Sequence, residues 1–204
     1  MQNAIPTILS TAYFPPISWV REMLNAGEVV LENCESYAKQ TYRNRCEIAS
    51  TNGKQSLTIP IMHDEARLIT DVKISNHSAW RHQHLNAIMS AYGESPFYEY
   101  YIDDILPVFE KNFTFLYDLN LASIQAVCNM IDAKIEWKTT DNFVKEYVNA
   151  KDFRNKINPK QQQNNEENTA KPYYQVFISK HGFMPNLSIL DLIFNQGPES
   201  LLYI

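Results

Sequence analysis

The pattern of hydrophobic and polar positions predicts a chain that alternates strands and helices from its start. A nearly continuous hydrophobic run over 5–14 predicts a buried strand, with Pro6 at or before its beginning because proline cannot donate to a ladder. Hydrophobic residues then recur at helical spacing over about 17–26, and a second short buried run follows at 28–31. Two neighbouring strands joined by a helix form a βαβ unit, so we expect these strands to be parallel.

A β-hairpin is predicted next. Extended segments at 42–50 and 55–62 flank Thr51–Lys54, whose Asn-Gly pair is the strongest short hairpin signal. The other elements expected from the pattern are a strand at 69–74, helices at about 79–92, 97–111 and 114–131, a returning strand at 134–139, and hydrophobic segments at 173–178, 187–196 and 198–204.

These elements predict a single α/β domain spanning residues 1–204. Its sheet is mixed, opened by the βαβ unit and extended by the hairpin, and several helices pack on it. The stretch 151–171 is rich in Gln, Asn and Glu and cannot bury hydrophobic surface, so we expect a mobile polar loop there. The chain becomes hydrophobic again afterwards, which predicts that its tail docks back onto the domain.

Composition excludes several classes of protein. The chain has only five glycines, never closer than 15 positions, so no phosphate-binding glycine loop can be drawn. Lys and Arg number 18 against 23 Asp and Glu, a net charge of −5 that argues against a nucleic-acid partner. Three scattered cysteines, no signal peptide and no run long enough to span a membrane favour a soluble protein of the reducing cytoplasm. Gly27, Gly93 and Gly197 each follow a predicted helix, where a left-handed conformation is common.

Arg43 and Arg45 are the first candidate site. They lie two apart in a predicted strand and therefore point to one face, while Asn44, Cys46 and Ile48 face the core. Two adjacent guanidiniums repel unless an anion lies between them, and their planar forks match phosphate or carboxylate oxygens. The alternative is a pair of surface charges balanced by acidic neighbours, either Glu47 or Glu35.

His84 is the second candidate, since it follows Trp80 by four residues on the hydrophobic face of a predicted helix. A core histidine satisfied by a neighbouring acceptor is one interpretation, and a general acid or base near neutral pH is the other. His82 diverges from His84, and His63 and His181 lie alone in predicted loops, so we expect no metal site.

Asp191 and Asn195 lie one turn apart in a hydrophobic helix. Ser188 and Asp191 have the spacing of a capping box, which would explain the acid as part of the helix start. The alternative is a buried carboxylate directed at a ligand or at an arginine.

The turn at 13–16 lies between the first strand and the first helix, where α/β sheets gather ligands and a helix start favours anions. Tyr92 and the aromatic run at 97–101 fit core and rim positions, with sugar stacking as the alternative. Ser10, Thr11 and Cys34 are nucleophile candidates without a base visible in the sequence.

Three stretches together resemble the WbqC-like family of bacterial proteins. They are Tyr13-Phe-Pro15; the series from Lys39–Arg45 through Leu57–Pro60 to Trp80, His84, Ala91-Tyr92 and Ser95–Phe97; and Leu187–Gly197. Two features depart from the family pattern. Ser10–Ala12 stand where many relatives have Gln-Pro, and Glu32–Glu35 replace an Asp-Asp segment, so no role of those residues is carried over.

The resemblance implies a cytoplasmic enzyme of envelope glycan biosynthesis. The family is associated with O-antigen gene clusters, which suggests aminoacyl or glycine transfer onto sugars. The resulting hypothesis is a transferase for an anionic sugar or acyl substrate, with no cofactor or oligomeric state assigned. His84 and Asp191 are its expected catalytic residues, and its expected substrate-binding residues are Tyr13, Arg43, Arg45, Trp80, Tyr92 and Asn195. A non-catalytic binding or assembly protein of the same pathway is the alternative.

Overall fold

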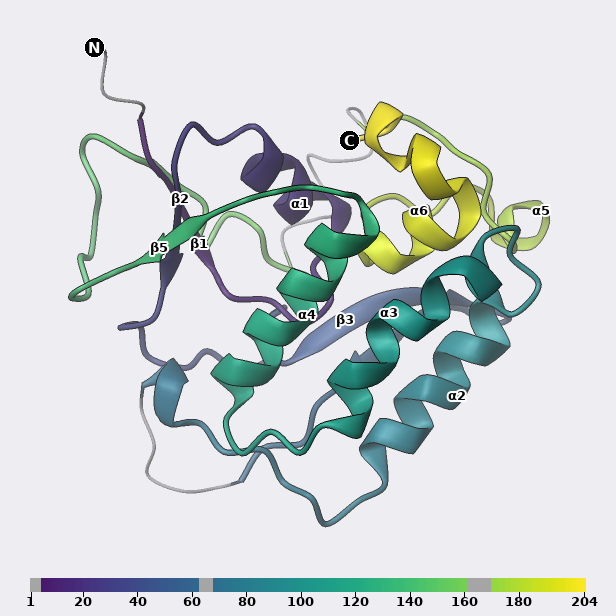
Figure 1. The fold of residues 1–204 in the computed structure, drawn as a ribbon, viewed down its shortest axis with the longest axis horizontal. Helices are drawn as coiled ribbons and strands as arrows, with labels where there is room; N and C mark the ends of the chain where they lie inside the picture. The colour runs from purple at the N-terminus through teal and green to yellow at the C-terminus, as the bar shows by residue number, and fades with distance from the viewer. Residues whose placement is uncertain (1–4, 63–67, 161–169) are drawn as a thin grey trace.

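A parallel four-stranded sheet lies at the N-terminal side of the molecule (Figure 1). This computed structural model describes residues 5–62, 68–160 and 170–204. The strand order is β5-β2-β1-β6, and every neighbouring pair is parallel. The strands are β1 (Thr7–Ser10), β2 (Val29–Glu32), β5 (Trp137–Thr139) and β6 (Lys151–Asp152).

The opening βαβ unit is confirmed. Thr7 pairs with Val29, and the register continues to Ser10 opposite Glu32. Helix α1 (Ile17–Leu24) connects the two strands and buries its hydrophobic face, including Trp19. All four residues of β1 are buried, as expected for a central strand of a parallel sheet.

The hairpin forms its own two-stranded sheet rather than extending the parallel one. Strands β3 (Arg45–Ser50) and β4 (Gly53–Thr58) pair with Arg45 opposite Thr58. Gly53 has a φ of 97°, the left-handed conformation that a hairpin turn needs and that glycine adopts without strain. Cys46 and Ile48 are completely buried, as predicted.

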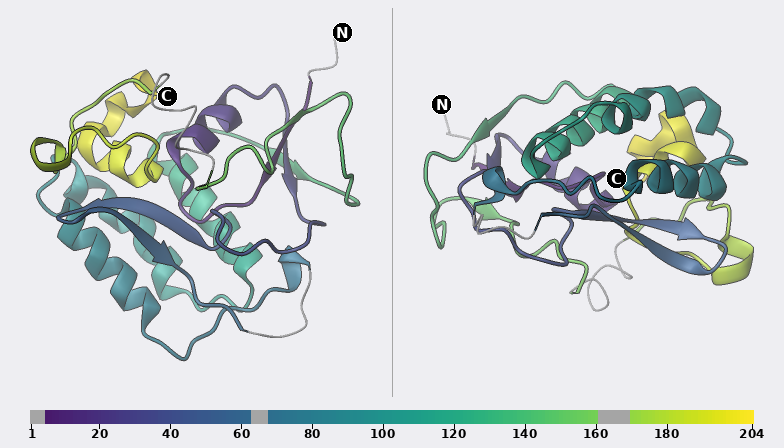
Figure 2. Two further views of the ribbon diagram at one scale, coloured as in Figure 1. Left: turned by 180° about the vertical axis from the view of Figure 1, so that it is seen from behind. Right: turned by 90° about the horizontal axis from the view of Figure 1, so that it is seen from below.

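Three long helices cover the hairpin as a layer, visible in teal in Figure 2. They are α2 (Trp80–Tyr92), α3 (Tyr98–Glu110) and α4 (Leu116–Met130), in agreement with the sequence pattern. The strand predicted at 69–74 is wrong, because Ile69–Asp71 form a 3-10 helix. The buried residues of this segment are Ile69, Val72 and Ile74. Their irregular spacing fits a turn that is followed by isolated β-bridges at Lys73 and Ile74.

The C-terminal segment returns to the domain, as predicted. After the short helix α5 (Ile178–His181), helix α6 (Ile189–Gln196) buries its first seven residues, and a 3-10 helix covers Gly197–Leu202. The expectation of a polar loop over 151–171 is wrong at its start, because Lys151 and Asp152 form β6 and pair with β1. Residues 161–169 and His63 lie outside the described part of the chain.

The glycines predicted to follow helices differ in backbone conformation. Gly197 has a φ of 54°, as its predicted place after a helix requires, whereas Gly93 is right-handed. Gly27 is also not among the residues with positive φ.

Within the described ranges, no helix is both long and hydrophobic enough to cross a bilayer.

Candidate functional site

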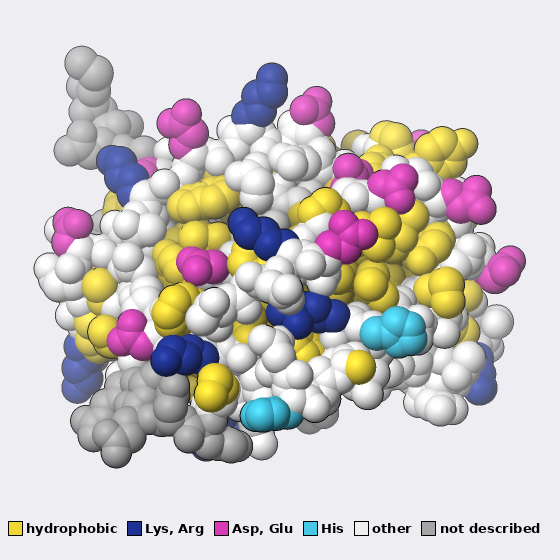
Figure 3. Space-filling model, turned by 60° about the horizontal axis from the view of Figure 1, so that its bottom comes forward, with side chains coloured by type: hydrophobic (Ala, Val, Ile, Leu, Met, Phe, Trp, Pro, Cys, Tyr) yellow, Lys and Arg dark blue, Asp and Glu magenta, His cyan; other side chains and the backbone are white. Residues whose placement is uncertain are grey.

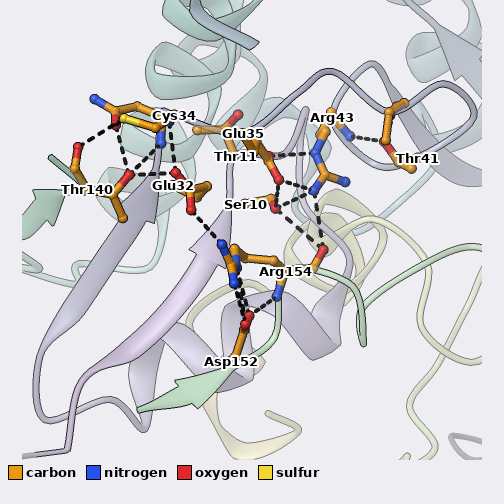
Figure 4. Close-up of polar contacts among 12 residues, drawn as sticks. Ser10, Thr11, Glu32, Cys34, Glu35, Thr41, Arg43, Thr140, Asp152 and Arg154 are labelled. Atoms are coloured by element: carbon orange, nitrogen blue, oxygen red, sulfur yellow. Dashed lines mark hydrogen bonds and ion pairs between the residues drawn. The ribbon is translucent and has the colours of Figure 1, made fainter. Parts of the chain in front are cut away.

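The carboxyl ends of the four parallel strands meet at one edge of the sheet, where open α/β sheets commonly bind ligands. Polar side chains are concentrated at this edge and are joined by hydrogen bonds and ion pairs (Figure 4). We call this group the sheet-edge network. Its members are Ser10, Glu32, Glu35, Arg43, Thr140, Asp152 and Arg154.

Arg43 is held inside the sheet-edge network. It lies in the turn before β3 rather than in the strand, so it does not share a strand face with Arg45 as predicted. Its Nε and Nη2 donate to the two Glu35 oxygens at 2.7 and 2.5 Å, and Nη2 also donates to Ser10 Oγ at 2.6 Å. Glu35 balances this charge, as one of the two alternatives expected, but the ion pair is buried rather than on the surface and does not include Arg45. It leaves the Arg43 guanidinium committed to a protein carboxylate.

Arg154 forms the second centre of the network. Its Nη1 donates to Glu32 at 2.7 Å, and its Nε and Nη2 both donate to Asp152. Glu32 is completely buried and also accepts from the Thr140 hydroxyl and the Cys34 backbone N–H. Burial raises the pKa of Asp152, but hydrogen bonds and the charge of Arg154 outweigh this and lower the pKa below its usual value.

The network leaves little room for a ligand. A cavity of about 10 Å³ lies between its two arginines, next to Ser10 and Trp19, and it has space for about one water molecule. Ser10 already donates to Glu35 and accepts from Arg43, so its hydroxyl is occupied on both sides. The geometry therefore favours a network that fixes the edge of the sheet.

Sequence reasoning missed Glu32 and Arg154 as site residues, and it named Glu35 only as a possible partner of the arginines. Glu32 was recognisable in principle, because it directly follows a predicted buried strand at its carboxyl end. Arg154 was not, because nothing in the polar stretch around it predicts the two-residue strand β6 that carries it to the sheet.

His84 lies in a separate buried cluster with Tyr13 and Trp80. Its Nδ1 is 3.0 Å from the Tyr13 hydroxyl, and a further hydrogen bond joins the imidazole to the backbone of Thr58. The tautomer of His84 decides which of the two groups donates in the contact with Tyr13. Burial lowers the pKa of His84 to about 4, so the imidazole is neutral at physiological pH. Trp80 packs edge-on against it, with ring centroids 5.1 Å apart.

Asp191 is fully buried in a third cluster. Ser188 caps α6 as predicted, but the Asp191 carboxylate does not complete a capping box. It accepts instead from the Tyr173 hydroxyl at 2.5 Å and from Gln175 at 2.8 Å. Burial raises its pKa to about 6, although these hydrogen bonds and one from Tyr92 act in the opposite direction. The cluster fastens the segment before α5 to α6.

Tyr92 and Asn195 belong to the same region as Asp191. The Tyr92 hydroxyl accepts from the Ala49 backbone N–H at 3.1 Å and so connects α2 to β3. Asn195 is buried and donates to the Asp191 carbonyl one turn earlier in α6. Both side chains thus serve the packing of α6 and its neighbours.

The Asp191 carboxylate predicts a distinctive pH dependence of stability. Its pKa is about 6 in the folded chain against an ordinary value of 3.8, so burial of the charged form opposes folding above pH 6 and has no effect below about pH 4. As the pH falls from 7 to 4, we expect the wild type to gain about 2 kcal/mol relative to Asp191→Asn, which is most of the shift in pKa at about 1.4 kcal/mol per unit. Urea unfolding of both proteins across this range measures the difference.

The control for this experiment is Asp118→Asn, which changes an exposed aspartate on α4. The difference in unfolding free energy between the wild type and Asp118→Asn should stay the same as the pH falls from 7 to 4. Parallel pH profiles for the wild type and Asp191→Asn would contradict the assignment.

The start of α1 does not offer a free anion site. The Ile17 N–H donates to the Leu187 carbonyl, and the Ser18 N–H donates to the Asn186 side chain at 2.8 Å. The preceding Phe14 has a φ of 37°, so the turn is tight. The first amides of the helix are therefore used to hold the C-terminal segment.

Arg45 lies apart from these clusters, in an open pocket of about 450 Å³ at the base of the hairpin. The volume falls within the usual range for small-molecule sites. Within the described part of the chain, the Arg45 side chain has no hydrogen bond or ion pair, and its Nε is buried without a partner. The pocket is lined by Tyr37, Lys39, Gln40, Asn44, Arg45, Thr58, Ile59, Pro60 and Ile61.

The described part of the structure thus does not bring the predicted site residues into one pocket. Arg43 belongs to the sheet-edge network, His84 to the Tyr13 cluster and Asp191 to the α6 cluster, while Arg45 faces an open pocket. The His84 cluster is nevertheless connected to that pocket, because His84 bonds to the backbone of Thr58, which forms part of the pocket wall.

Basic side chains also lie over the rings of two buried aromatic residues. Arg81 covers Trp80 at 4.7 Å and Lys111 covers Phe113 at 5.0 Å. Figure 3 shows a face on which Lys and Arg side chains lie among hydrophobic ones. Over the described residues, no three His, Cys, Asp or Glu side chains are grouped so that they could hold a metal ion.

Comparison with known proteins gives a family for the chain. The family model described as the WbqC-like protein family matches residues 11–152 and 142–203. The chain is also similar to the uncharacterised protein Rv1507c of Mycobacterium tuberculosis, with 22% identity over 97% of this chain and 96% of that protein. No solved structure matches the chain.

Proposed function

Because the chain belongs to the WbqC-like protein family, we propose that it is a transferase of bacterial surface-polysaccharide biosynthesis. Its substrate in this proposal is an anionic sugar or acyl compound of the cytoplasm, and the reaction is aminoacyl or glycine transfer to a sugar. The observation that carries the anionic part of the proposal is that the Arg45 side chain, in a pocket of ligand size, has no ion pair with any described residue.

Charge supports an anion in the Arg45 pocket. Arg45 and Lys39 are its cationic lining residues, and the described lining contains no carboxylate. A half-buried guanidinium without a partner among the described residues favours a ligand with phosphate or carboxylate oxygens, which its planar fork can bind through two hydrogen bonds. Tyr37 adds an aromatic ring at the rim of the same pocket.

In this proposal, His84 holds a wall residue of the Arg45 pocket in place. It is buried and neutral, and its hydrogen bond to Thr58 holds the strand residue that pairs with Arg45 across the hairpin. This makes His84 a positioning residue for the pocket wall. The acid/base role expected for His84 and the orienting role expected for Asp191 stay predictions.

The second candidate function is a non-catalytic binding protein of the same pathway. It is favoured by one observation: Arg43, His84 and Asp191 lie in separate buried clusters, where each already forms hydrogen bonds with other protein groups. Turnover distinguishes the two candidates. A transferase converts a bound donor and a sugar into product detected by mass spectrometry, whereas a binding protein leaves both unchanged.

Arg45→Ala is expected to weaken binding of an anionic ligand about 10- to 100-fold, since a hydrogen bond to a charged group is worth about 1.5–3 kcal/mol. Calorimetric titration with inorganic phosphate, nucleotide sugars and aminoacyl phosphates measures this change. Arg21→Ala, which removes a partly exposed arginine of α1 outside the pocket, is the matched control and should bind as the wild type does. Equal affinities for the wild type and Arg45→Ala would remove the basis for an anion at this pocket.

A further inference from the structure

A second hollow lies at the opposite end of the hairpin, between its tip and helix α2. Its volume is about 260 Å³. Two alanines of α2, Ala87 and Ala91, form part of its lining, and the absence of larger side chains at these positions leaves the space open. We call this hollow the tip groove. Its other lining residues are Ser50, Thr51, Gln55, Asn86 and Ser90.

The chemistry of the tip groove differs from that of the Arg45 pocket. Each of its five polar lining side chains is a hydroxyl or a carboxamide, and the described lining contains no charged or aromatic side chain. Hydroxyls and carboxamides donate and accept hydrogen bonds, so they match a ligand whose groups also do both. A charged ligand would find no opposite charge in this lining.

Several of these polar groups are available to a ligand. Asn86 uses its Nδ2 in a hydrogen bond of 3.2 Å with His82, which orients the amide and leaves the Oδ1 without a described partner. The side chains of Gln55 and Ser90 make no hydrogen bond with any described residue. Both residues are exposed.

The hairpin tip beside the groove is held rigidly. The Thr51 carbonyl accepts from Lys180 Nζ at 2.6 Å and is 3.0 Å from His181 Nε2, so helix α5 fixes the tip. Ser50 Oγ donates to the Gly53 carbonyl at 2.8 Å and accepts from the backbone of the turn. A rigid wall lowers the entropic cost of binding, since little needs to be ordered when a ligand arrives.

From this combination of size, neutrality and rigidity, we infer that the tip groove binds a neutral polyhydroxylated ligand, one sugar unit in size. The site is separate from the Arg45 pocket. Gln55 and Thr58, one from each lining, lie three residues apart on β4, or about 10 Å along the strand. The inference does not depend on the anion proposed for Arg45.

Amide-resolved NMR titration of the full chain with glucose and with N-acetylglucosamine tests the inference. We expect saturable shifts confined to residues 50–55 and 86–91. Asn86→Ala should weaken binding about three- to tenfold, the effect of one neutral hydrogen bond. Ala87→Leu should abolish binding by filling the groove from an otherwise unchanged helix, so it tests the site even if Asn86→Ala alters the local fold.

Gln125→Ala is the matched control, because it removes an exposed carboxamide on α4 whose one partner among the described residues is Asn129. It should leave sugar binding unchanged. Shifts that do not saturate, that fall elsewhere, or that persist in Ala87→Leu would overturn the inference. A parallel titration with inorganic phosphate separates the two sites. If phosphate shifts residues near Arg45 and the sugars shift nothing at the tip groove, only the inference about the tip groove is overturned. If the sugars shift the tip groove and phosphate shifts nothing near Arg45, only the anion proposal is overturned.

Discussion

Arg154→Ala is expected to lower the free energy of unfolding by about 3–5 kcal/mol, the usual cost of breaking a buried ion pair by removing one partner. Arg154 is almost completely buried and bonds to both Glu32 and Asp152. Its removal leaves the Glu32 carboxylate, which is inaccessible to solvent, without a compensating charge. Denaturant unfolding at pH 7 measures the loss.

The double variant Glu32→Gln with Arg154→Met provides the control. Because it removes both charges while retaining their bulk, it should recover a large part of the stability lost in Arg154→Ala. If Arg154→Ala cost less than 1 kcal/mol, the ion pair would not contribute as the structure indicates. The comparison also tests whether the network at the sheet edge is needed for folding or only for its local geometry.

Gly197→Ala is expected to destabilise the chain by about 2–4 kcal/mol, combining backbone strain with overpacking. Gly197 has a φ of 54°, which favours glycine, and a Cβ at this position would lie 2.5 Å from the Phe97 ring. The ring is part of an aromatic contact with Tyr100 and cannot move without disturbing the start of α3. Thermal and denaturant unfolding report the change.

Gly182→Ala separates the two causes. Gly182 also has a positive φ, of 70°, but a Cβ there meets no atom within 4 Å. Its substitution should cost only the strain, about 1–2 kcal/mol. Equal losses for the two variants would mean that the contact with Phe97 adds nothing.

The elements with strong periodicity could be predicted from the sequence. The βαβ unit, the hairpin with its Asn-Gly turn and the three long helices follow from local patterns whose preferences agree with the fold. The segment at 69–74 shows the limit of the method. Its hydrophobic residues resemble a strand, but their burial depends on contacts with the segment after β4 and with the start of α4 that no local pattern contains.

The candidate site was harder to predict because its residues depend on pairings far apart in the chain. Asp191 has the spacing of a capping residue, yet its partners Tyr173 and Gln175 precede it across a loop. The spacing of Arg43 and Arg45 suggested a shared strand face, but the strand begins only at Arg45. Because the strand begins at Arg45 and not at residue 42 as predicted, one arginine lies inside the protein and the other lies in an open pocket.

The short strand β6 has a consequence for how the protein is made. The inner strand β1 has one partner nearby in sequence and another about 144 residues later, where Ile8 lies opposite Asp152. A nascent chain leaving the ribosome can therefore form the opening unit and the hairpin early, but the edge of β1 stays unpaired until three quarters of the protein has been synthesised. The unpaired edge of β1 is the part of the growing chain most exposed to misassembly with other strands.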